Sequence, residues 1–297
     1  MGGGDPRRAG PGTAIVAPGG TAIGAPRGTK QSCPGAVLGH TGRVQGFDTE
    51  SYGESFADIY DDWYGDVSDT EGTVAFLSGL VGGRRVLELG VGTGRLALPL
   101  AAAGFTVSGV DSSAPMIELL RAKPGGEAIE VAIGDMADIA TLAPPAGVDF
   151  GVAFVAFNTF FNLTSRDAQQ RCLDGVASRL EPDGRFVLEA FVPGDDARGG
   201  EAMTVRTMEL DRVVLSISRR DPATQTATGQ YVELSDAGVR LRPWMIRYAA
   251  PPELDTMARA AGLELLERWA GWRGEEYTDS STHHVSVYRL AGGATPG

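Results

Sequence analysis

Three glycines at alternate positions carry the strongest chemical signal in this 297-residue chain. Gly90, Gly92 and Gly94 lie between a short apolar run, Val86 to Leu89, and a segment of helical character, Thr93 to Ala103. Glycine permits a tight turn between a strand and a helix, and it lets the backbone approach a ligand closely. The start of the helix then offers unpaired N–H groups to an acceptor. The pattern therefore predicts a ligand-binding turn.

Acidic residues accompany the predicted strands around this turn. Glu88 lies inside the apolar strand, where burial without a partner is costly, so we expect it to meet a ligand cation or a donor. Asp111 ends the next strand, where this fold class places an acid that accepts hydrogens from a ribose diol. Asp135 follows the third strand and can accept from an adenine amino group, while Met136 packs against the ring. Two neighbours of Asp111 complete the predicted cofactor-binding set, namely Ser112 and Met116.

The glycine pattern is G-x-G-x-G, with Arg95 where a dinucleotide-binding turn needs glycine. No G-x-x-x-x-G-K-[ST] phosphate-binding loop occurs in the sequence. At the glycines and the acidic positions named above, the chain resembles the class I S-adenosylmethionine-dependent methyltransferases, over roughly residues 84–192. The resemblance implies S-adenosylmethionine as the cofactor. A nicotinamide-dependent dehydrogenase is the alternative, which Arg95 and the Gly-Asp pair at 134–135 oppose.

Strands and helices alternate after residue 84, which predicts an α/β fold with a doubly wound, Rossmann-like parallel sheet. By resemblance, the sheet has seven strands in the order 3-2-1-4-5-7-6, with strand 7 antiparallel. Residues 200–250 break the alternation with short strands and turns, which predicts an antiparallel insertion after strand 5. The expected strands of the main sheet are 86–89, 105–110, 129–133, 148–155, 185–191, 263–272 and 283–290, and the expected helices are 93–103, 113–123, 166–180 and 252–261.

Three segments make up the expected domain organisation. Residues 1–45 are rich in Gly, Ala, Pro and Thr and are predicted to be disordered. Residues 46–82 are predicted to form a helical cap because aromatic residues recur there at helical spacing, and residues 83–297 form the methyltransferase domain. By resemblance, Tyr60 and Tyr64 close over the cofactor, with Tyr60 also a candidate catalytic residue; the alternative is that both pack on the core.

Candidate acceptor-binding residues follow the fourth predicted strand. Asn158, Phe161 and Asn162 lie at the carboxyl edge of the sheet, where open α/β sheets bind ligands. The two asparagines could instead cap a turn and a helix. Glu189 ends the fifth strand at the same edge, and it is a candidate general base or a capping partner.

Further candidates lie in the insertion and the last strand. His283 and His284 are candidate bases, of which at most one can face the site because neighbouring strand residues point to opposite faces. Arg242, Trp244 and Arg247 are candidate substrate contacts that could hold a phosphate or diphosphate. The alternatives are a core histidine and a solvated strand face.

The composition limits the partners. A net charge of −12 opposes binding to bulk nucleic acid. The sequence has no apolar run long enough for a membrane span and no apolar leader, so we expect a cytoplasmic protein with no membrane partner. The predicted function is methyl transfer by in-line displacement to a small-molecule acceptor in secondary metabolism. C-methylation of an isoprenoid diphosphate and non-catalytic cofactor binding are the alternatives; a metal requirement and a homo-oligomeric state stay open.

Overall fold

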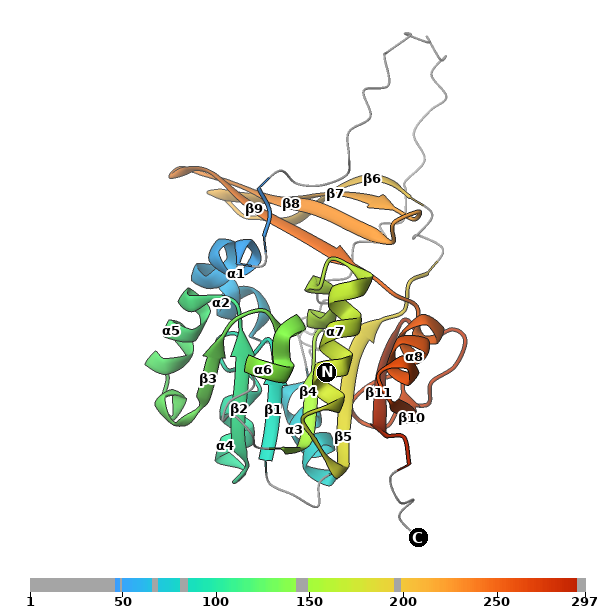
Figure 1. Cartoon of the computed structure of the whole chain (residues 1–297). Coiled ribbons are helices and arrows are strands. Elements are labelled where there is room, and N and C mark those ends of the chain that lie inside the picture. Colours follow the sequence, from blue (N-terminus) through green and yellow to red (C-terminus); the bar gives the residue numbers. More distant parts are fainter. Residues whose placement is uncertain are drawn as a thin grey trace, which may run out of the picture.

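The computed structural model describes residues 46–48, 50–65, 69–80, 85–142, 149–194 and 199–292. These residues form a large sheet with helices on both faces and a second, smaller antiparallel sheet (Figure 1). The predicted disordered tail, residues 1–45, lies outside the described residues. In the part of the chain that is described, no helix is long and apolar enough to cross a membrane.

The large sheet has seven strands in the order β10-β11-β5-β4-β1-β2-β3. Neighbouring strands from β3 to β5 run parallel, whereas β11 pairs antiparallel with both β5 and β10. The predicted order, 3-2-1-4-5-7-6 with strand 7 antiparallel, is therefore confirmed. The strands are β1 (Arg85–Leu89), β2 (Thr106–Asp111), β3 (Glu130–Ile133), β4 (Phe150–Val155), β5 (Leu180–Phe191), β10 (Leu263–Trp269) and β11 (His283–Leu290).

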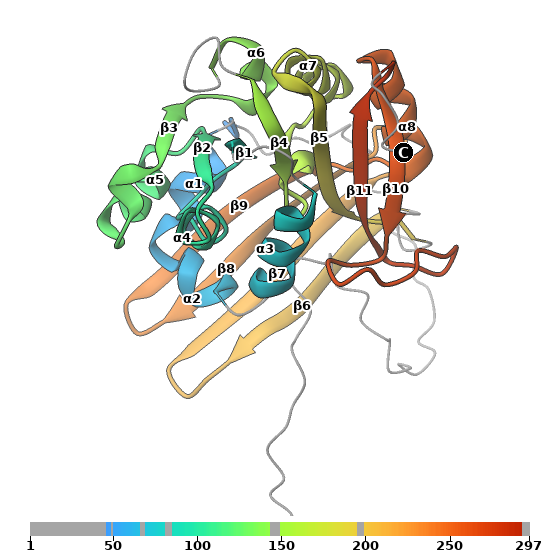
Figure 2. The same cartoon turned by 90° about the horizontal axis from the view of Figure 1, so that it is seen from below.

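Alternating side chains of the central strands enter two separate cores. Leu87 and Ala153 pack on one face of the sheet, with residues of α7 and α8, while Val86 and Val152 pack on the other, with residues of α3 and α4. Strands buried on both faces are expected for a parallel sheet covered by helices (Figure 2). The helices that cover the two faces of the large sheet are α3 (Thr70–Gly79), α4 (Ala97–Ala102), α5 (Ala114–Ala122), α6 (Ile139–Leu142), α7 (Arg166–Ala177) and α8 (Pro251–Ala260).

Local sequence explains where several of these helices begin. The Ser113 hydroxyl accepts a hydrogen bond from the N–H of Met116 and caps α5, and Ser165 caps α7 in the same way. The helix predicted from Thr93 begins instead at Ala97. Gly92 and Gly94 both have positive φ, so the backbone continues to turn at residues where a helix was expected.

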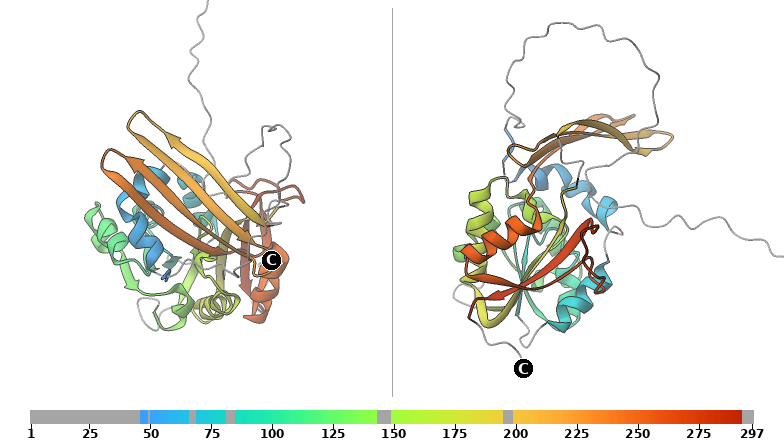
Figure 3. Two further views of the ribbon diagram at one scale, coloured as in Figure 1. Left: turned by 90° about the horizontal axis from the view of Figure 1, so that it is seen from above. Right: turned by 90° about the vertical axis from the view of Figure 1, so that its right-hand side faces the viewer.

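The predicted insertion forms a separate four-stranded sheet in the order β6-β7-β8-β9. This roof sheet, as we call it, lies above the carboxyl ends of the parallel strands (Figures 1 and 3). Each strand is antiparallel to its neighbour. The strands are β6 (Gly200–Met208), β7 (Arg212–Asp221), β8 (Thr226–Ser235) and β9 (Gly238–Arg247).

The N-terminal cap lies between the roof sheet and the large sheet. It starts with three short turns of helix, α1 (Ser51–Phe56), η1 (Ala57–Ile59) and α2 (Tyr60–Tyr64), in place of one continuous helix. Within the cap, the rings of Tyr52 and Phe56 stack with their centroids 4.5 Å apart, and Phe56 contacts Tyr231 of the roof sheet edge-to-face at a centroid distance of 5.8 Å. The aromatic residues of the cap thus join the two sheets.

Candidate functional site

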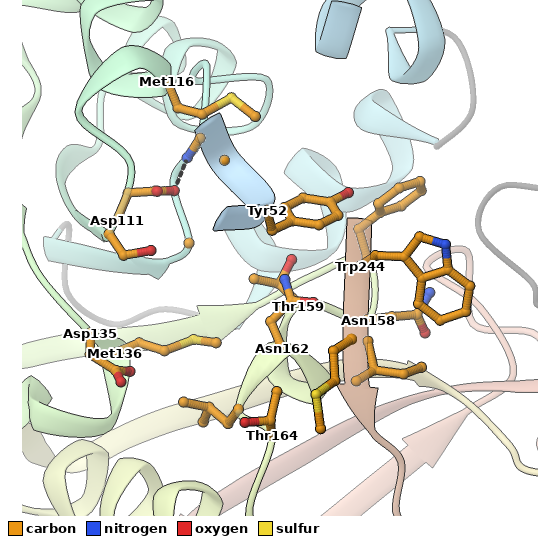
Figure 4. A pocket seen from close by; sticks show the side chains of 18 of the residues that line it. Tyr52, Asp111, Met116, Asp135, Met136, Asn158, Thr159, Asn162, Thr164 and Trp244 are labelled. Carbon is orange, nitrogen blue, oxygen red and sulfur yellow. Dashed lines mark hydrogen bonds between the residues drawn. The ribbon is translucent and has the colours of Figure 1, made fainter. Parts of the chain in front are cut away.

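A cavity of about 400 Å³ lies where the large sheet, the cap and the roof sheet meet. This is within the size range of small-molecule and cofactor sites. Figure 4 shows Asp111, Met116, Asp135 and Met136 on one side of the cavity and Asn158 and Trp244 on the other. The carboxyl ends of the parallel strands form its floor, as expected for ligand sites in open α/β sheets.

The glycine turn forms part of the cavity wall. Gly90 and Gly92 both line it, with φ of +74° and +53°. A Cβ at Gly90 would lie 2.4 Å from Cγ2 of Thr159, whereas a Cβ at Gly92 would meet no atom within 4 Å. The empty space beside Gly92 leaves its backbone open to a ligand. Gly94 lies outside the lining, where it fits against Leu120, so its role is helix packing.

Asp111 closes the turn from the neighbouring strand. Its Oδ2 accepts a hydrogen bond from the N–H of Gly92 at 2.7 Å, and its Oδ1 accepts one from the N–H of Ser113 at 2.9 Å. Burial raises the pKa of Asp111. Each carboxylate oxygen has a second lone pair, so the side chain can still accept two hydrogens from a vicinal diol in the cavity.

The third strand supplies a second acid. Asp135 accepts a hydrogen bond from the N–H of Ala137 at 2.9 Å, which begins a short turn of helix with Asp135 at its N-terminus. Asp135, Met136, Ser112 and Met116 all line the cavity. Two thioether side chains beside a carboxylate provide an apolar slot with one hydrogen-bond acceptor, which fits a flat ring that carries an amino group.

Glu88 lies in a second, much smaller pocket on the other side of the glycine turn, which Tyr60 and Arg95 also line. Burial raises its pKa to about 8, even though Arg95 acts in the opposite direction. Within the described part of the chain, its Oε2 is buried without a hydrogen-bond partner. An unpaired buried acceptor beside open space is costly unless a donor or a cation fills that space.

Asn158 and its neighbours form the cavity wall opposite Asp111 and Asp135. Phe157 and Asn158 both have positive φ, +59° and +64°, which is strained for residues with side chains. The strained loop is fixed by two hydrogen bonds of 2.6 Å: the N–H of Phe157 donates to Oε2 of Glu189, and Oδ1 of Asn158 accepts from the N–H of Phe191. Asn158, Thr159 and Asn162 line the cavity as a result.

Known proteins match both this motif and this arrangement. Residues 86–184 match the family described as a methyltransferase domain. The chain is 31% identical over 244 residues to a cypemycin N-terminal methyltransferase from Streptomyces sp, covering 81% of this chain and 98% of that protein.

The chain belongs to the S-adenosylmethionine-dependent methyltransferases.

Solved structures of methyltransferases share the fold. The CcbJ methyltransferase from Streptomyces caelestis is 41% identical, with a TM-score of 0.74, and the match covers 82% of this chain and all of that one. The sugar N-methyltransferase KedS8 from Streptoalloteichus sp ATCC 53650 is 20% identical, with a TM-score of 0.58 over 91% of this chain. The fold of this methyltransferase thus has counterparts among solved methyltransferase structures.

S-adenosylmethionine is the cofactor of this methyltransferase, and the residues present fit it. Asp111 would hold the ribose diol, and Asp135 with Met136 would hold the adenine. The unpaired Oε2 of Glu88 would accept from the ammonium of the methionine portion of the cofactor. Tyr60 and Arg95, which line the same small pocket, would lie beside the carboxylate of that methionine portion. When bound, the cofactor supplies a methyl group already activated by a sulfonium.

Two arginines of the methyltransferase predicted to bind substrate have other partners. The guanidinium of Arg242 is buried and donates to both carboxylate oxygens of Asp58, at 2.6 and 3.0 Å, and to the carbonyl oxygen of Ser55. Arg247 donates to Gln169 and Glu253, each at 2.6 Å. Neither lines the cavity, so the structure does not place these two residues where a diphosphate in the cavity would need them. Trp244, on the same strand, does line it.

The candidate bases also lie outside the cavity lining. His284 is fully buried beside Ser286, and burial lowers its pKa to about 3, so it stays neutral. His283 lies 3.0 Å from the hydroxyl of Thr282 at the other face of β11. The carboxylate of Glu189 accepts a hydrogen bond from the N–H of Phe157, and burial raises the pKa of Glu189. None of the three therefore lies where it could exchange a proton with a molecule in the cavity, because none belongs to its lining.

Two aromatic predictions are wrong in placement. Phe161 is fully buried behind the wall, with its ring centroid 5.0 Å from that of Phe191. Tyr64 is also fully buried and does not line the cavity. Its ring contacts that of Phe157 at a centroid distance of 5.8 Å. Tyr60 does line the cavity, and burial raises its pKa to about 12, so its hydroxyl stays protonated.

Several lining residues of the methyltransferase were not predicted. Tyr52 comes from the cap, Thr164 from the loop before α7, and Ser216 and Tyr231 from the roof sheet. Tyr52 belongs to the aromatic pattern of the cap, which was a usable signal. The residues of the roof sheet have no local motif, because only the packing of the sheet over the cavity turns them inward.

Proposed function

We propose that this methyltransferase transfers a methyl group to an amine nitrogen of a small-molecule acceptor in natural-product metabolism. The cypemycin relative, 31% identical, is named as an N-terminal methyltransferase, which supports nitrogen as the methylated atom. In this proposal, the acceptor occupies the half of the cavity between Asn158, Tyr231 and Trp244, with the cofactor in the other half.

The charge of the cavity wall carries this proposal. Among the described residues that line the cavity, the charged side chains are Asp48, Asp111 and Asp135, with no Arg, Lys or His. The acceptor half offers amides, hydroxyls and aromatic rings. Such a wall suits a neutral or cationic acceptor, because carboxylates and aromatic faces attract an amine and repel a phosphate.

The same wall disfavours C-methylation of an isoprenoid diphosphate. A diphosphate needs arginine forks or a metal ion. The arginines of β9 are held in ion pairs with Asp58 and Glu253, and the described residues contain no cluster of three or more His, Cys, Asp or Glu suited to a metal. The amine acceptor is therefore favoured.

The chain's own part in the reaction is alignment and exclusion of water. In-line displacement at an activated methyl needs the nucleophile held on the far side of the carbon, which the rigid Phe157–Asn158 loop and the roof sheet can provide. Tyr52 and Trp244 close the cavity from the cap and the roof and keep water away from the transferred methyl. In the proposed mechanism, the amine loses its proton to solvent before it binds. The described lining holds no histidine, Asp111 and Asp135 are assigned to the cofactor, and the hydrogen bonds from Ser51 lower the pKa of Asp48, which makes it a weak base.

A competition experiment tests the proposal. The purified protein is incubated with isotopically labelled S-adenosylmethionine and a panel of amino sugars, amino acids, free N-terminal peptides, phenols and prenyl diphosphates, and the products are located by mass spectrometry. We expect label on nitrogen, and kcat/KM should rise with pH with an apparent pKa that follows the acceptor amine. Label on carbon or oxygen would contradict nitrogen transfer. Tight cofactor binding with no turnover of any amine would favour non-catalytic binding.

A further inference from the structure

The outer face of the roof sheet, which is turned away from the rest of the molecule, is apolar. Three cross-strand rows define it, and each row takes one residue from β6, β7, β8 and β9 in turn. Apart from Gln230, all its members are apolar. The rows are Met203–Ile217–Gln230–Pro243, Val205–Leu215–Val232–Leu241 and Met208–Val213–Leu234–Val239.

Seven of these twelve side chains are exposed in the single chain, and the other five are half-buried. The exposed fraction is 69% for Met203, 73% for Met208 and 68% for Val239, and the middle row is open at both ends, at Val205 and Leu241. Large apolar surfaces that stay in contact with water are rare on monomeric proteins, and a contiguous patch marks an interaction site.

The inner face shows the reverse pattern. Its rows include Thr204–Ser216–Tyr231–Arg242, followed by Glu233 and Arg240 in the neighbouring row. A sheet that covers one core normally turns its apolar face inward and its polar face to water. Here the inward face serves the cavity and the ion pair with Asp58, so the apolar face is left without a partner in one chain.

We propose that the outer face of the roof sheet binds the same face of a second copy of this chain, forming a twofold dimer. Two sheets can pack face to face about 10 Å apart, with their side chains interdigitated. In an isologous contact, each apolar row meets apolar rows of the other copy. The Glu201–Arg219 ion pair, 3.1 Å long, lies at one border of the face and supplies a polar rim.

Area and charge favour a second copy over other partners. Four strands spaced about 4.8 Å apart, each about 30 Å long, present roughly 600 Å² per copy, which brings a dimer to the lower end of standard interfaces. A lipid surface would suit the apolar side chains, but cell membranes carry negative charge, and this chain has a net charge of −12. The face itself is uncharged, so a second copy meets no opposed charges at its centre.

The dimer would also hold the acceptor site in shape. Ser216, Tyr231 and Trp244 line the cavity from the inner side of the same strands whose outer side faces the second copy. A sheet packed on both faces keeps its twist and its height above the cavity, so the contact stabilises the roof without adding a residue to the site.

Sedimentation velocity on the full chain tests the proposal. The wild-type protein should sediment at twice the 31.1 kDa chain mass at micromolar concentration. The double variant Val205→Lys/Leu241→Lys places charges at both ends of the middle row and should raise the dimer dissociation constant about 100-fold. Leu119→Lys is the matched control, because Leu119 is 38% exposed on α5 and stands alone there, so its dimer should be unchanged.

Cofactor binding by calorimetry reports whether the double variant is folded. If it is not, the single variant Met203→Lys replaces it, since a side chain that is 69% exposed contributes little to the fold. A wild-type protein that stays monomeric at 100 μM overturns the proposal, and so does a dimer that the lysines leave unchanged. Wild-type monomers that bind neutral lipid vesicles through this face would identify a membrane partner and also overturn it.

Discussion

The two halves of the cavity are built in different ways. The cofactor half takes most of its residues from the stretch of chain between Glu88 and Met136, in or directly after strands β1 to β3, with Met116 from the start of α5 and Tyr60 from the cap as additions. The acceptor half takes its residues from the cap, the loop after β4 and the roof sheet, which include Tyr52, Asn158 and Trp244. Recognition of the cofactor is thus a local property of strand–turn–helix units, whereas recognition of the acceptor depends on how distant elements pack.

This difference has a physical consequence for the arginines and acids. In the cofactor half, the key polar groups have free bonding capacity: Asp111 retains lone pairs and Glu88 has an unpaired oxygen. Behind the acceptor half, outside the cavity lining, the charged side chain of Arg242 is paired with Asp58 and holds the cap to the roof sheet. Free polar groups point to ligand binding, whereas fully paired ones point to architecture.

The largest expected effect lies in the glycine turn. Gly92→Val should weaken cofactor binding about 1,000-fold, because the side chain enters the cavity from a residue with φ of +53°. Calorimetric titration measures this. Gly262→Val is the matched control, since Gly262 has φ of +80° and equally open surroundings but caps α8 far from the site. An equal loss of cofactor affinity in both variants would show that backbone strain at a positive φ, and not a side chain in the cavity, weakens binding.

A smaller but global effect is expected at the contact between cap and roof. Arg242→Met should lower the free energy of unfolding by about 2–3 kcal/mol, because it removes the buried guanidinium from Asp58 and leaves Glu233 with only the longer contact to Arg212, at 3.9 Å. Arg240→Met removes a contact to the same Asp58 carboxylate from a side chain that is 58% exposed, and it should cost under about 0.5 kcal/mol. Chemical denaturation compares the two. Similar decreases in the free energy of unfolding for both variants would show that the number of ion pairs, and not the burial of the arginine, determines the stability.

Glu88 predicts a pH-dependent cofactor affinity. Burial raises the pKa of Glu88 from 4.5 to about 8, so the folded, cofactor-free protein keeps a proton there that the unfolded chain releases. The stability from this proton is fully present below pH 4.5 and is lost as the pH rises through 8. Pairing with the cofactor ammonium needs the carboxylate, so the affinity should fall about tenfold per unit as the pH drops below 8.

Glu88→Gln separates the two consequences. The variant should bind the cofactor more weakly at pH 8, show no such slope between pH 6 and 8, and have a higher Tm than the wild type above pH 8 without cofactor. Calorimetry and thermal melts at several pH values measure both. A slope that persists in the variant would assign the proton to another group.

The acceptor half should respond to Tyr231→Phe without a response from the cofactor half. Loss of this lining hydroxyl should raise the acceptor KM roughly fivefold, while the cofactor Kd stays unchanged. Tyr288→Phe is the control, because it removes a buried hydroxyl that donates to Asp255 at 2.9 Å outside the lining. Steady-state kinetics decides between them; a raised cofactor Kd in Tyr231→Phe would mean that the halves are not separable.

The smallest effect is expected at His283. His283→Ala should keep turnover within about twofold of the wild type, because the imidazole lies against Thr282 and outside the cavity lining. Rates measured across pH 6 to 9 check this. A loss above tenfold with normal cofactor binding would restore the histidine as a catalytic base.

The sheet and the cofactor residues were predictable because each depends on short-range sequence. Neighbouring residues in the sequence specify strand β1, its glycine turn and the caps of α5 and α7. The order of the seven strands was predicted from the resemblance to the family. Placement failed where burial decided. Arg247 and His284 have ordinary types and spacing for a site, yet both side chains are turned into the protein and bonded there.

By itself, the sequence determined the strand, the glycine turn after it and the acids that end the neighbouring strands, because these depend on nearby residues; the resemblance of these residues to class I methyltransferases then indicated S-adenosylmethionine. Tertiary structure decided the surroundings of the proposed acceptor half: which face of the roof sheet is turned toward the cavity, that Glu189 supports the loop at Phe157, and that Arg242 binds Asp58. The reason is that a strand shows its alternation in sequence, but which of its two faces meets the rest of the protein depends on elements far away along the chain.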